Sequence, residues 1–167
     1  GGCVDTIPIS VEGFNKLRQE LDELKKERPE VIQAIKEARE EGDLRENAGY
    51  DAARERQGML EARINFIESR LPKCDVIDVS DMQGETVSFG ATVEIEDIDT
   101  GERKRITLLG PDEADYKKGS ISIYSPLAQG LVGKAAGDGA EVDAPRGKIM
   151  YEIISVEYKG FPEGHFS

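Results

Sequence analysis

Apolar residues recur at alternating steps of three and four through the first half of the chain, which is the heptad spacing of a coiled coil. One such run lies before, and one after, a short segment at 41–47 that contains Gly42. We call these spaced positions the seam. The upstream seam is Phe14, Leu17, Leu21, Leu24, Arg28, Val31, Ile35 and Ala38, and the downstream seam is Tyr50, Ala53, Gln57, Leu60, Ile64, Ile67 and Leu71.

Two seams of similar length, separated by a few residues, are satisfied when the chain folds back into an antiparallel hairpin. At 1.5 Å per residue, a first helix from Ser10 to Glu41 would run roughly 48 Å. Pro29 predicts a local irregularity but no helix end, because the heptad phase continues past it. The sequence therefore predicts a coiled-coil hairpin over 10–74 with its tip at 42–46.

Beyond Pro72 the period changes to two, which is typical of strands. The pattern predicts a curled antiparallel sheet over one short helix at 126–131, giving an α+β class and a globular domain at 75–158. Ile153 and Ile154 fall out of phase, which predicts a bulge or a switch of the buried face. Residues 1–9 and 159–167 are interpreted as tails. The expected strands are 76–79, 92–96, 104–109, 120–124, 140–143 and 148–158.

Composition limits the classes of function. The net charge of −12 disfavours a general grip on nucleic-acid backbone, so any RNA contact must be local. No apolar run is long enough to span a bilayer and no leader pattern is present, so a soluble cytoplasmic protein is the expectation. A monomer is expected because the seam is already used within the hairpin. Cys3 and Cys74 lack the spacing of a disulfide or zinc framework. His165 lies in the tail, where we expect it to be solvated, and no role is assigned to it.

The tip carries the candidate chemistry, and two interpretations compete. Asp43 and Glu46 have the spacing of a capping box, with Asp43 as the N-cap of the second helix and Gly42 closing the first. The same pair suits Mg²⁺, which takes one or two protein carboxylates and leaves its other positions to water and phosphate. Two carboxylates do not complete an octahedral shell. If the pair holds metal, a partner supplies the rest of the site.

Three arginines lie near the tip, and their roles are open to interpretation from the sequence. Arg39 and Arg54 each lie one step past a seam residue, so they are expected to come close across the hairpin, where the ordinary interpretation is solvated surface charges. Arg45 lies between the two acids. Arg28, at a seam position, is expected to snorkel at a weak point in the packing. Asn47 and Tyr50 are expected to support the tip and to take no part in chemistry.

The run Ala38-Arg39-Glu40-Glu41-Gly42-Asp43-Leu44-Arg45-Glu46-Asn47-Ala48 resembles the coiled-coil tip of the bacterial Gre transcript-cleavage factors, and the small basic patch is similar to their GreA type. A second match, Ser125-Pro126-Leu127-Ala128-Gln129-Gly130-Leu131-Val132-Gly133-Lys134, resembles a signature of their C-terminal domain. The resemblance covers about Ile7 to Tyr158. Gly49 departs from it, because many members carry an acid there.

The resemblance implies an elongation factor that is not itself an enzyme. It would bind bacterial RNA polymerase, reach through the secondary channel and stimulate Mg²⁺-dependent cleavage at the 3′ end of backtracked nascent RNA. Asp43 and Glu46 would be the catalytic acids and metal ligands, with no metal bound stably by this chain alone. Arg39, Arg45 and Arg54 would contact RNA, and an FKBP-like C-terminal domain would dock on the polymerase through Ser125, Pro126, Leu127 and Ala128.

Taken alone, the Ser125-Pro126 corner is common helix-start chemistry. Asp112, Glu113 and Asp115 are expected to complement basic residues of the polymerase. Three alternatives to a cleavage factor stay open: a channel regulator of the same fold without cleavage activity, a peptidyl-prolyl isomerase or chaperone, and a structural coiled-coil adaptor in which the tip acids are caps only.

Overall fold

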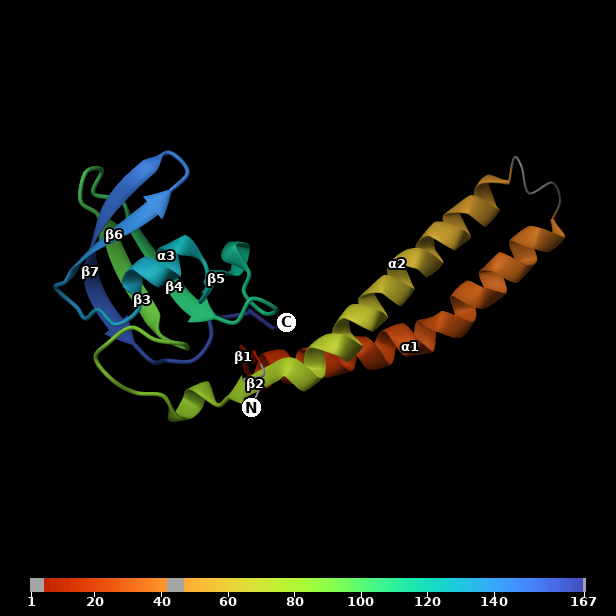
Figure 1. The fold of residues 1–167 in the computed structure, drawn as a ribbon, viewed down its shortest axis with the longest axis horizontal. Helices are drawn as coiled ribbons and strands as arrows, with labels where there is room; N and C mark the ends of the chain where they lie inside the picture. The colour runs from red at the N-terminus through yellow and green to blue at the C-terminus, as the bar shows by residue number, and fades with distance from the viewer. Residues whose placement is uncertain (1–4, 42–46, 167) are drawn as a thin grey trace. The chain divides into compact units, whose positions relative to one another are not determined.

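The computed structural model describes residues 5–41 and 47–166. They form two compact units, one made of residues 1–14 and 74–167 and the other of residues 15–73. The predicted α+β class is confirmed, with a long helical hairpin followed by a domain built on a curled sheet (Figure 1). The expected boundaries at 10–74 and 75–158 differ from this division, because residues 7–14 and 159–166 belong to the globular unit.

The hairpin consists of α1 (Val11–Glu40) and α2 (Ala48–Arg70), and α1 is helical on both sides of Pro29. The two seams bury each other, since Ile64 and Ile67 are fully enclosed and Val31 is too. Arg28 does not snorkel. It donates two hydrogen bonds, of 2.7 and 2.9 Å, to the Glu61 carboxylate on the other helix. Three more ion pairs cross between the helices: Lys25 with Glu68, Arg56 with Glu27, and Arg63 with Glu20.

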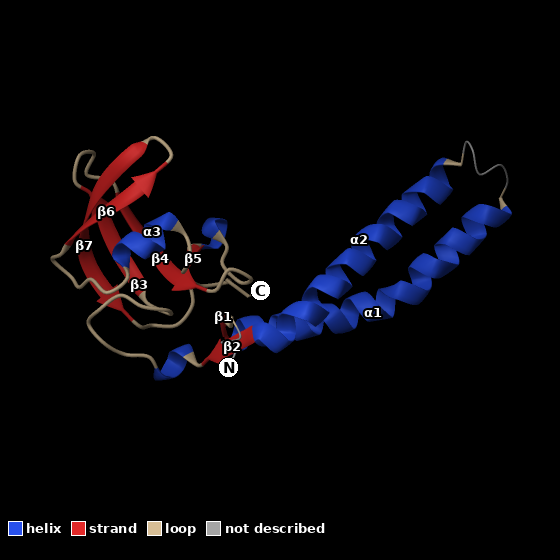
Figure 2. Ribbon diagram, in the orientation of Figure 1, coloured by secondary structure: helices blue, strands red, loops and turns tan. Residues whose placement is uncertain are grey.

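The sheet of the globular unit has five strands in the order β5-β4-β3-β7-β6 and packs one face on the short helix α3 (Pro126–Leu131) (Figure 2). The expected bulge is confirmed, because the pairing of β3 with β7 skips Ile154 between Ser155 and Ile153. One expectation was wrong: β5 runs parallel to β4, so the sheet is not wholly antiparallel. The strands are β3 (Thr92–Asp97), β4 (Arg103–Leu109), β5 (Ser120–Ser122), β6 (Gly139–Ala144) and β7 (Gly147–Glu157).

Two short strands flank the hairpin in sequence. β1 (Ile7–Ser10) pairs in parallel with β2 (Cys74–Ile77), in the register Ile7 to Cys74 and Ser10 to Ile77. The strand predicted at 76–79 is therefore displaced, and it belongs to this separate pair and not to the antiparallel sheet. Short 3₁₀ turns in the described part of the chain are Leu71–Lys73, Val79–Asp81 and Tyr116–Lys118.

The start of α1 is anchored inside the globular unit. The Oγ atom of Ser10 accepts a hydrogen bond from the Gly13 amide at 3.0 Å, so Ser10 caps the helix as predicted. The Glu113 carboxylate accepts from the Ser10 amide at 2.9 Å, the Gly110 amide at 3.0 Å and the Ser10 hydroxyl. A Cβ at Gly13 would collide with this carboxylate, so the close approach requires glycine.

The C-terminal segment packs into the globular unit and is not a free tail. His165 is 4% exposed, and its Nε2 atom lies 2.6 Å from the Oγ atom of the buried Ser120. Lys118 donates to the His165 carbonyl at 3.3 Å, and Phe161 packs against a second apolar cluster around Leu109. The expectation that His165 is solvated was wrong, because aromatic residues beside it give the segment enough apolar surface to dock.

Candidate functional site

One side chain joins the two helix ends that flank the tip. Asn47 is the N-cap of α2, since its Oδ1 atom accepts a hydrogen bond from the Tyr50 amide at 2.9 Å. Its Nδ2 atom donates to the carbonyl oxygen of Ala38, in the last turn of α1, at 2.6 Å. One amide therefore satisfies an unpaired N–H of one helix and a terminal carbonyl of the other. These two bonds join the helix ends beside the tip, and the support role expected for Asn47 stays a prediction.

This arrangement corrects the capping-box interpretation. The N-cap of α2 is Asn47 and not Asp43, because helical structure begins at Ala48. Asp43, Arg45 and Glu46 lie outside the described residues, so their predicted roles stay predictions. The start of α2 nonetheless has its cap without them.

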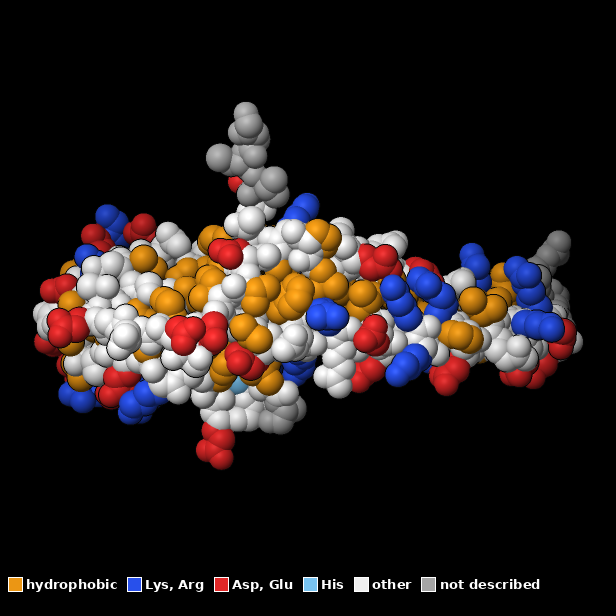
Figure 3. All heavy atoms as spheres, turned by 90° about the horizontal axis from the view of Figure 1, so that it is seen from below, with side chains coloured by type: hydrophobic (Ala, Val, Ile, Leu, Met, Phe, Trp, Pro, Cys, Tyr) orange, Lys and Arg blue, Asp and Glu red, His pale blue; other side chains and the backbone are white. Residues whose placement is uncertain are grey.

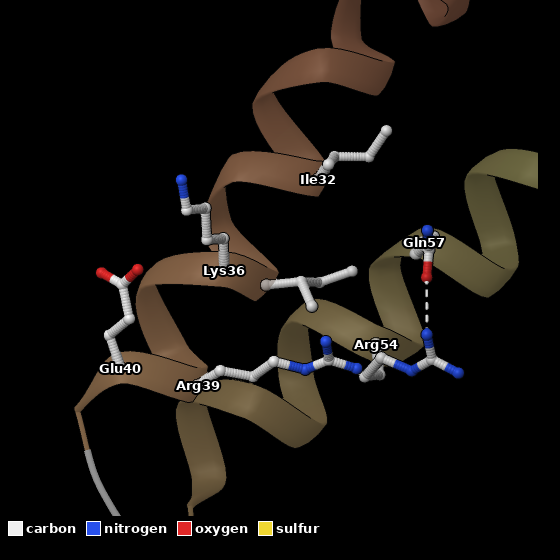
Figure 4. A pocket seen from close by; sticks show the side chains of 7 residues that line it. Ile32, Lys36, Arg39, Glu40, Arg54 and Gln57 are labelled. Atoms are coloured by element: carbon white, nitrogen blue, oxygen red, sulfur yellow. Dashed lines mark hydrogen bonds between the residues drawn. The ribbon is translucent and has the colours of Figure 1, made fainter.

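Arg39 and Arg54 line a cup of about 410 Å³ on the surface of the hairpin, together with Ile32, Ile35, Lys36, Glu40 and Gln57. Figure 4 shows the Arg39 side chain extending from α1 toward Arg54 on α2. The structure therefore brings together the two arginines that the sequence predicted to be close. The guanidinium carbon of Arg39 lies 5.8 Å from the centre of the Tyr50 ring, which is cation–π distance. Arg54 donates from Nη1 to the Oε1 atom of Gln57 at 3.1 Å.

The charges around this cup differ from those along the rest of the hairpin. Arg28 and Arg63 are neutralised by glutamates of the facing helix, and their hydrogen bonds lower the pKa of Glu61 and Glu20. Within the described parts of the chain, neither Arg39 nor Arg54 forms an ion pair. On the face drawn in Figure 3, acidic and basic side chains are interspersed along the hairpin. The cup is thus a local positive site on an acidic protein, suited to an anion such as a phosphate.

The described residues hold no cluster of three or more His, Cys, Asp or Glu side chains that would bind a metal ion. The two tip acids, Asp43 and Glu46, are not among the residues described, so the Mg²⁺ expectation stays a prediction. Carboxylate oxygens are the protein ligands that Mg²⁺ prefers, so the chemistry of Asp43 and Glu46 fits the ion.

The predicted docking corner forms the start of α3. Ser125 is its N-cap, accepting from the Ala128 amide at 3.2 Å, and Pro126 occupies the first turn. Ala128 is fully buried, so any docking role for it is indirect. Leu127 is half-buried and Pro126 is exposed. Sequence reasoning missed two exposed apolar side chains that flank the helix, Tyr124 and Val132, which are 55% and 42% exposed.

Glu113 is not available to a partner in the way that the sequence suggested. Its carboxylate is held by Ser10 and Gly110, and burial raises its pKa above the ordinary value. Asp115 is also used internally, since it caps the 3₁₀ turn at 116–118 by accepting from the Lys117 amide at 3.0 Å. Glu113 and Asp115 therefore serve the fold.

Known proteins match the chain over both units. Residues 7–76 match the family described as transcription elongation factor, N-terminal, of GreA and GreB, and residues 82–158 match the GreA/GreB C-terminal family. The chain belongs to the GreA/GreB family of transcription elongation factors. A family member of this kind interacts with RNA polymerase, and the relatives below place this one with the GreA type.

Transcription elongation factor GreA of Nitratidesulfovibrio vulgaris is 68% identical over 157 residues, which cover 94% of this chain and 96% of the relative. The GreA factor of Francisella tularensis subsp. novicida is 52% identical, over 93% of this chain and 98% of the relative. Among solved structures, GreA factor homolog 1 of Thermus thermophilus is 27% identical, covering 91% of this chain and 99% of that one, with a TM-score of 0.42. No helix among the described residues of this GreA/GreB family member is both long and apolar enough to cross a membrane.

Proposed function

We propose that this GreA-type factor stimulates RNA polymerase to cleave the 3′ end of backtracked nascent RNA, with the hairpin tip inserted through the secondary channel of the polymerase. The factor is not a nuclease by itself, and it acts as a monomer in the cytoplasm, where bacterial transcription takes place. The observation that carries the proposal is the cup of Arg39 and Arg54, close to the tip in sequence and without ion-pair partners among the described residues.

The chemistry divides between the tip and the cup. Asp43 and Glu46 are the residues that would hold Mg²⁺, and the bound ion would stabilise charge that develops on the RNA phosphate. Arg39 and Arg54 bind the phosphates of the RNA 3′ segment, and Arg45 adds a further positive charge. Asn47 fixes the two helix ends from which the tip begins. Asn47 forms the N-cap of α2, so neither tip acid is needed for that cap.

Docking of the globular unit on the polymerase involves the corner of α3. Pro126 and Leu127 are the members of the predicted set that reach the surface, and Tyr124 and Val132 extend this apolar surface on either side. Ser125 acts by capping the helix, and Ala128 by packing beneath it. Apolar anchors of this kind supply binding energy in interfaces with a polar rim.

The test is release of RNA from a stalled, backtracked bacterial transcription complex in the presence of Mg²⁺. We expect the parent protein to stimulate cleavage and the Asp43→Asn/Glu46→Gln variant to lose at least about 100-fold of that stimulation, which is typical for removal of essential catalytic groups. Asp51→Asn/Glu55→Gln is the matched control, because it removes two exposed acids of α2 and should retain activity.

Binding to polymerase and thermal melting are measured for all three proteins. Equal folding and equal binding, with cleavage lost only in the tip variant, support the proposal. Binding of the parent without any stimulation of cleavage contradicts it and indicates a channel regulator. A tip variant that fails only because it unfolds contradicts the catalytic role of the acids and returns them to a structural one.

A further inference from the structure

Gln57 is a polar residue at a seam position. It follows Ala53 by four residues and precedes Leu60 by three, and both of those neighbours are buried against α1. An apolar side chain at such a position would pack in the interface, and a polar one lowers coiled-coil stability. Gln57 is half-buried and lies in the wall of the arginine cup. Its presence at this position therefore calls for an explanation other than packing.

The other polar seam residue, Arg28, has a different kind of partner. Its guanidinium is closed into a two-bond ion pair with Glu61, so the pair has no net charge. The Glu27–Arg56 and Glu20–Arg63 pairs follow the same rule. Carboxylate partners hold these arginines and cancel their charge at the same time.

The two arginines of the cup are held by uncharged groups. Arg54 donates to the neutral amide oxygen of Gln57, as the dashed line in Figure 4 shows. Arg39 lies over the ring of Tyr50. A neutral partner orients a guanidinium without cancelling its charge, so each arginine keeps its attraction for an anion. The Ile32 and Ile35 side chains form apolar parts of the same cup.

We propose that Gln57 is a positioning residue that aims the Arg54 guanidinium beside that of Arg39, so that the pair binds a phosphate of the RNA strand. This inference rests on the proposed function of the cup and adds the group that preorganises it. Gln57 itself makes no contact with the phosphate. It reduces the conformational freedom that Arg54 would otherwise lose on binding.

The Gln57 amide has an acceptor oxygen and no charge, and two substitutions separate these two properties. Gln57→Met keeps the length of the side chain and removes the acceptor, so the seam becomes more apolar. We expect this variant to melt at or above the temperature of the parent, and its cleavage rate in the backtracked complex to fall about 3- to 10-fold at saturating factor. Gln57→Glu keeps an acceptor but neutralises Arg54. We expect it to be folded and to lose a similar share of activity.

A double-mutant cycle with Arg54→Ala is the decisive measurement. If Gln57 acts through Arg54, Gln57→Met has no further effect on cleavage once Arg54 is alanine. A purely structural role predicts that the two losses multiply, which would overturn the inference. Full cleavage activity of the Gln57→Met variant that retains Arg54 would overturn the inference as well.

A second measurement uses the protein without polymerase. Titration with inorganic pyrophosphate, followed by NMR signals of the arginine side chains, should shift Arg39 and Arg54 in the parent, with about threefold weaker binding in Gln57→Met. Equal binding by both proteins contradicts the inference whatever the polymerase assay shows. A parent that binds pyrophosphate through this pair but stimulates no cleavage contradicts the proposed function and leaves the role of Gln57 standing.

Discussion

The two long helices begin in opposite ways. α1 starts inside the globular unit, where Ser10 caps it and Glu113 accepts three hydrogen bonds from Ser10 and Gly110. α2 starts beside the tip, where the single side chain of Asn47 supplies both the cap and the link to α1. Among the described residues, the first start is held by four hydrogen bonds that involve Ser10, Gly110 and Glu113, and the second by two that involve Asn47. In the proposed function, the helix start nearest the partner is the one that depends on a single side chain.

The start of α1 should be the more costly of the two to disrupt. Glu113→Ala leaves two backbone amides and one hydroxyl without their acceptor in a part-buried site. We expect it to lower the free energy of unfolding by about 3 kcal/mol, because each buried unsatisfied donor costs about 1 kcal/mol or more. Urea unfolding measures this directly.

Glu12→Ala is the control for that experiment, since it removes an exposed acid from the same turn and should change stability by less than about 0.5 kcal/mol. Equal effects of the two substitutions would show that the Glu113 contacts contribute nothing specific, and the contrast between the two helix starts would be lost.

Disruption of the α2 start should lower the free energy of unfolding less than disruption of the α1 start, and it should lower RNA cleavage more. Asn47→Ala removes the cap and should lower the free energy of unfolding by about 1 kcal/mol. Asn47→Ser keeps a cap oxygen but is too short to reach the Ala38 carbonyl, so stability should stay within about 0.5 kcal/mol of the parent. We expect RNA cleavage to fall in both variants, because the link between the helix ends is lost in both.

Cleavage assays of the two Asn47 variants, carried out with melting curves, distinguish these effects. Parent-like cleavage by Asn47→Ser would mean that the bond to Ala38 does not orient the tip. In that case Asn47 would be a helix cap only.

The smallest expected effect is a difference in pH dependence between two glutamates. Burial raises the pKa of Glu113, so its ionisation is harder in the folded protein, and its contribution to stability is present below its ordinary pKa and lost as the pH rises through the raised value. The hydrogen bond from Arg28 lowers the pKa of Glu61, so its contribution is present above the ordinary pKa and lost as the pH falls.

Unfolding of the parent, Glu113→Gln and Glu61→Gln between about pH 4 and pH 7 tests both directions. The advantage of the parent over Glu113→Gln should shrink as the pH rises, and its advantage over Glu61→Gln should grow. Parallel curves for the two glutamine variants would contradict the opposite shifts.

Much of the fold could be predicted because its signals are local. The heptad seam located both helices, the period of two located most strands, and the phase change at Ile153 and Ile154 indicated the bulge. The pairing of β1 with β2 could not be found in this way, because it joins segments that are more than 60 residues apart and neither strand has an alternating pattern. The parallel placement of β5 beside β4 depends on the same kind of distant contact.

The candidate site also combines features that local sequence predicts with features that depend on distant contacts. The closeness of Arg39 and Arg54 follows from their offset against the seam, so the sequence was sufficient to predict it. The expected N-cap at Asp43 was wrong because Asn and Asp are about equally favoured as N-caps, so residue preference does not choose between Asp43 and Asn47. Burial of Glu113 and His165 depends on groups brought from elsewhere in the chain, namely Ser10 and Ser120.

The parallel pairing of β1 with β2 has a consequence for how this protein can change. The chain leaves the globular unit after Phe14, four residues beyond β1, and returns at Cys74, the first residue of β2, which pairs with β1. The hairpin is therefore an insertion in the globular unit, and the two ends of the insertion lie close together. Adding or removing one heptad from each helix would change the length of the hairpin by about 10 Å and leave both strands in register. The length of the hairpin can therefore change, in evolution or by design, without changes to the globular unit.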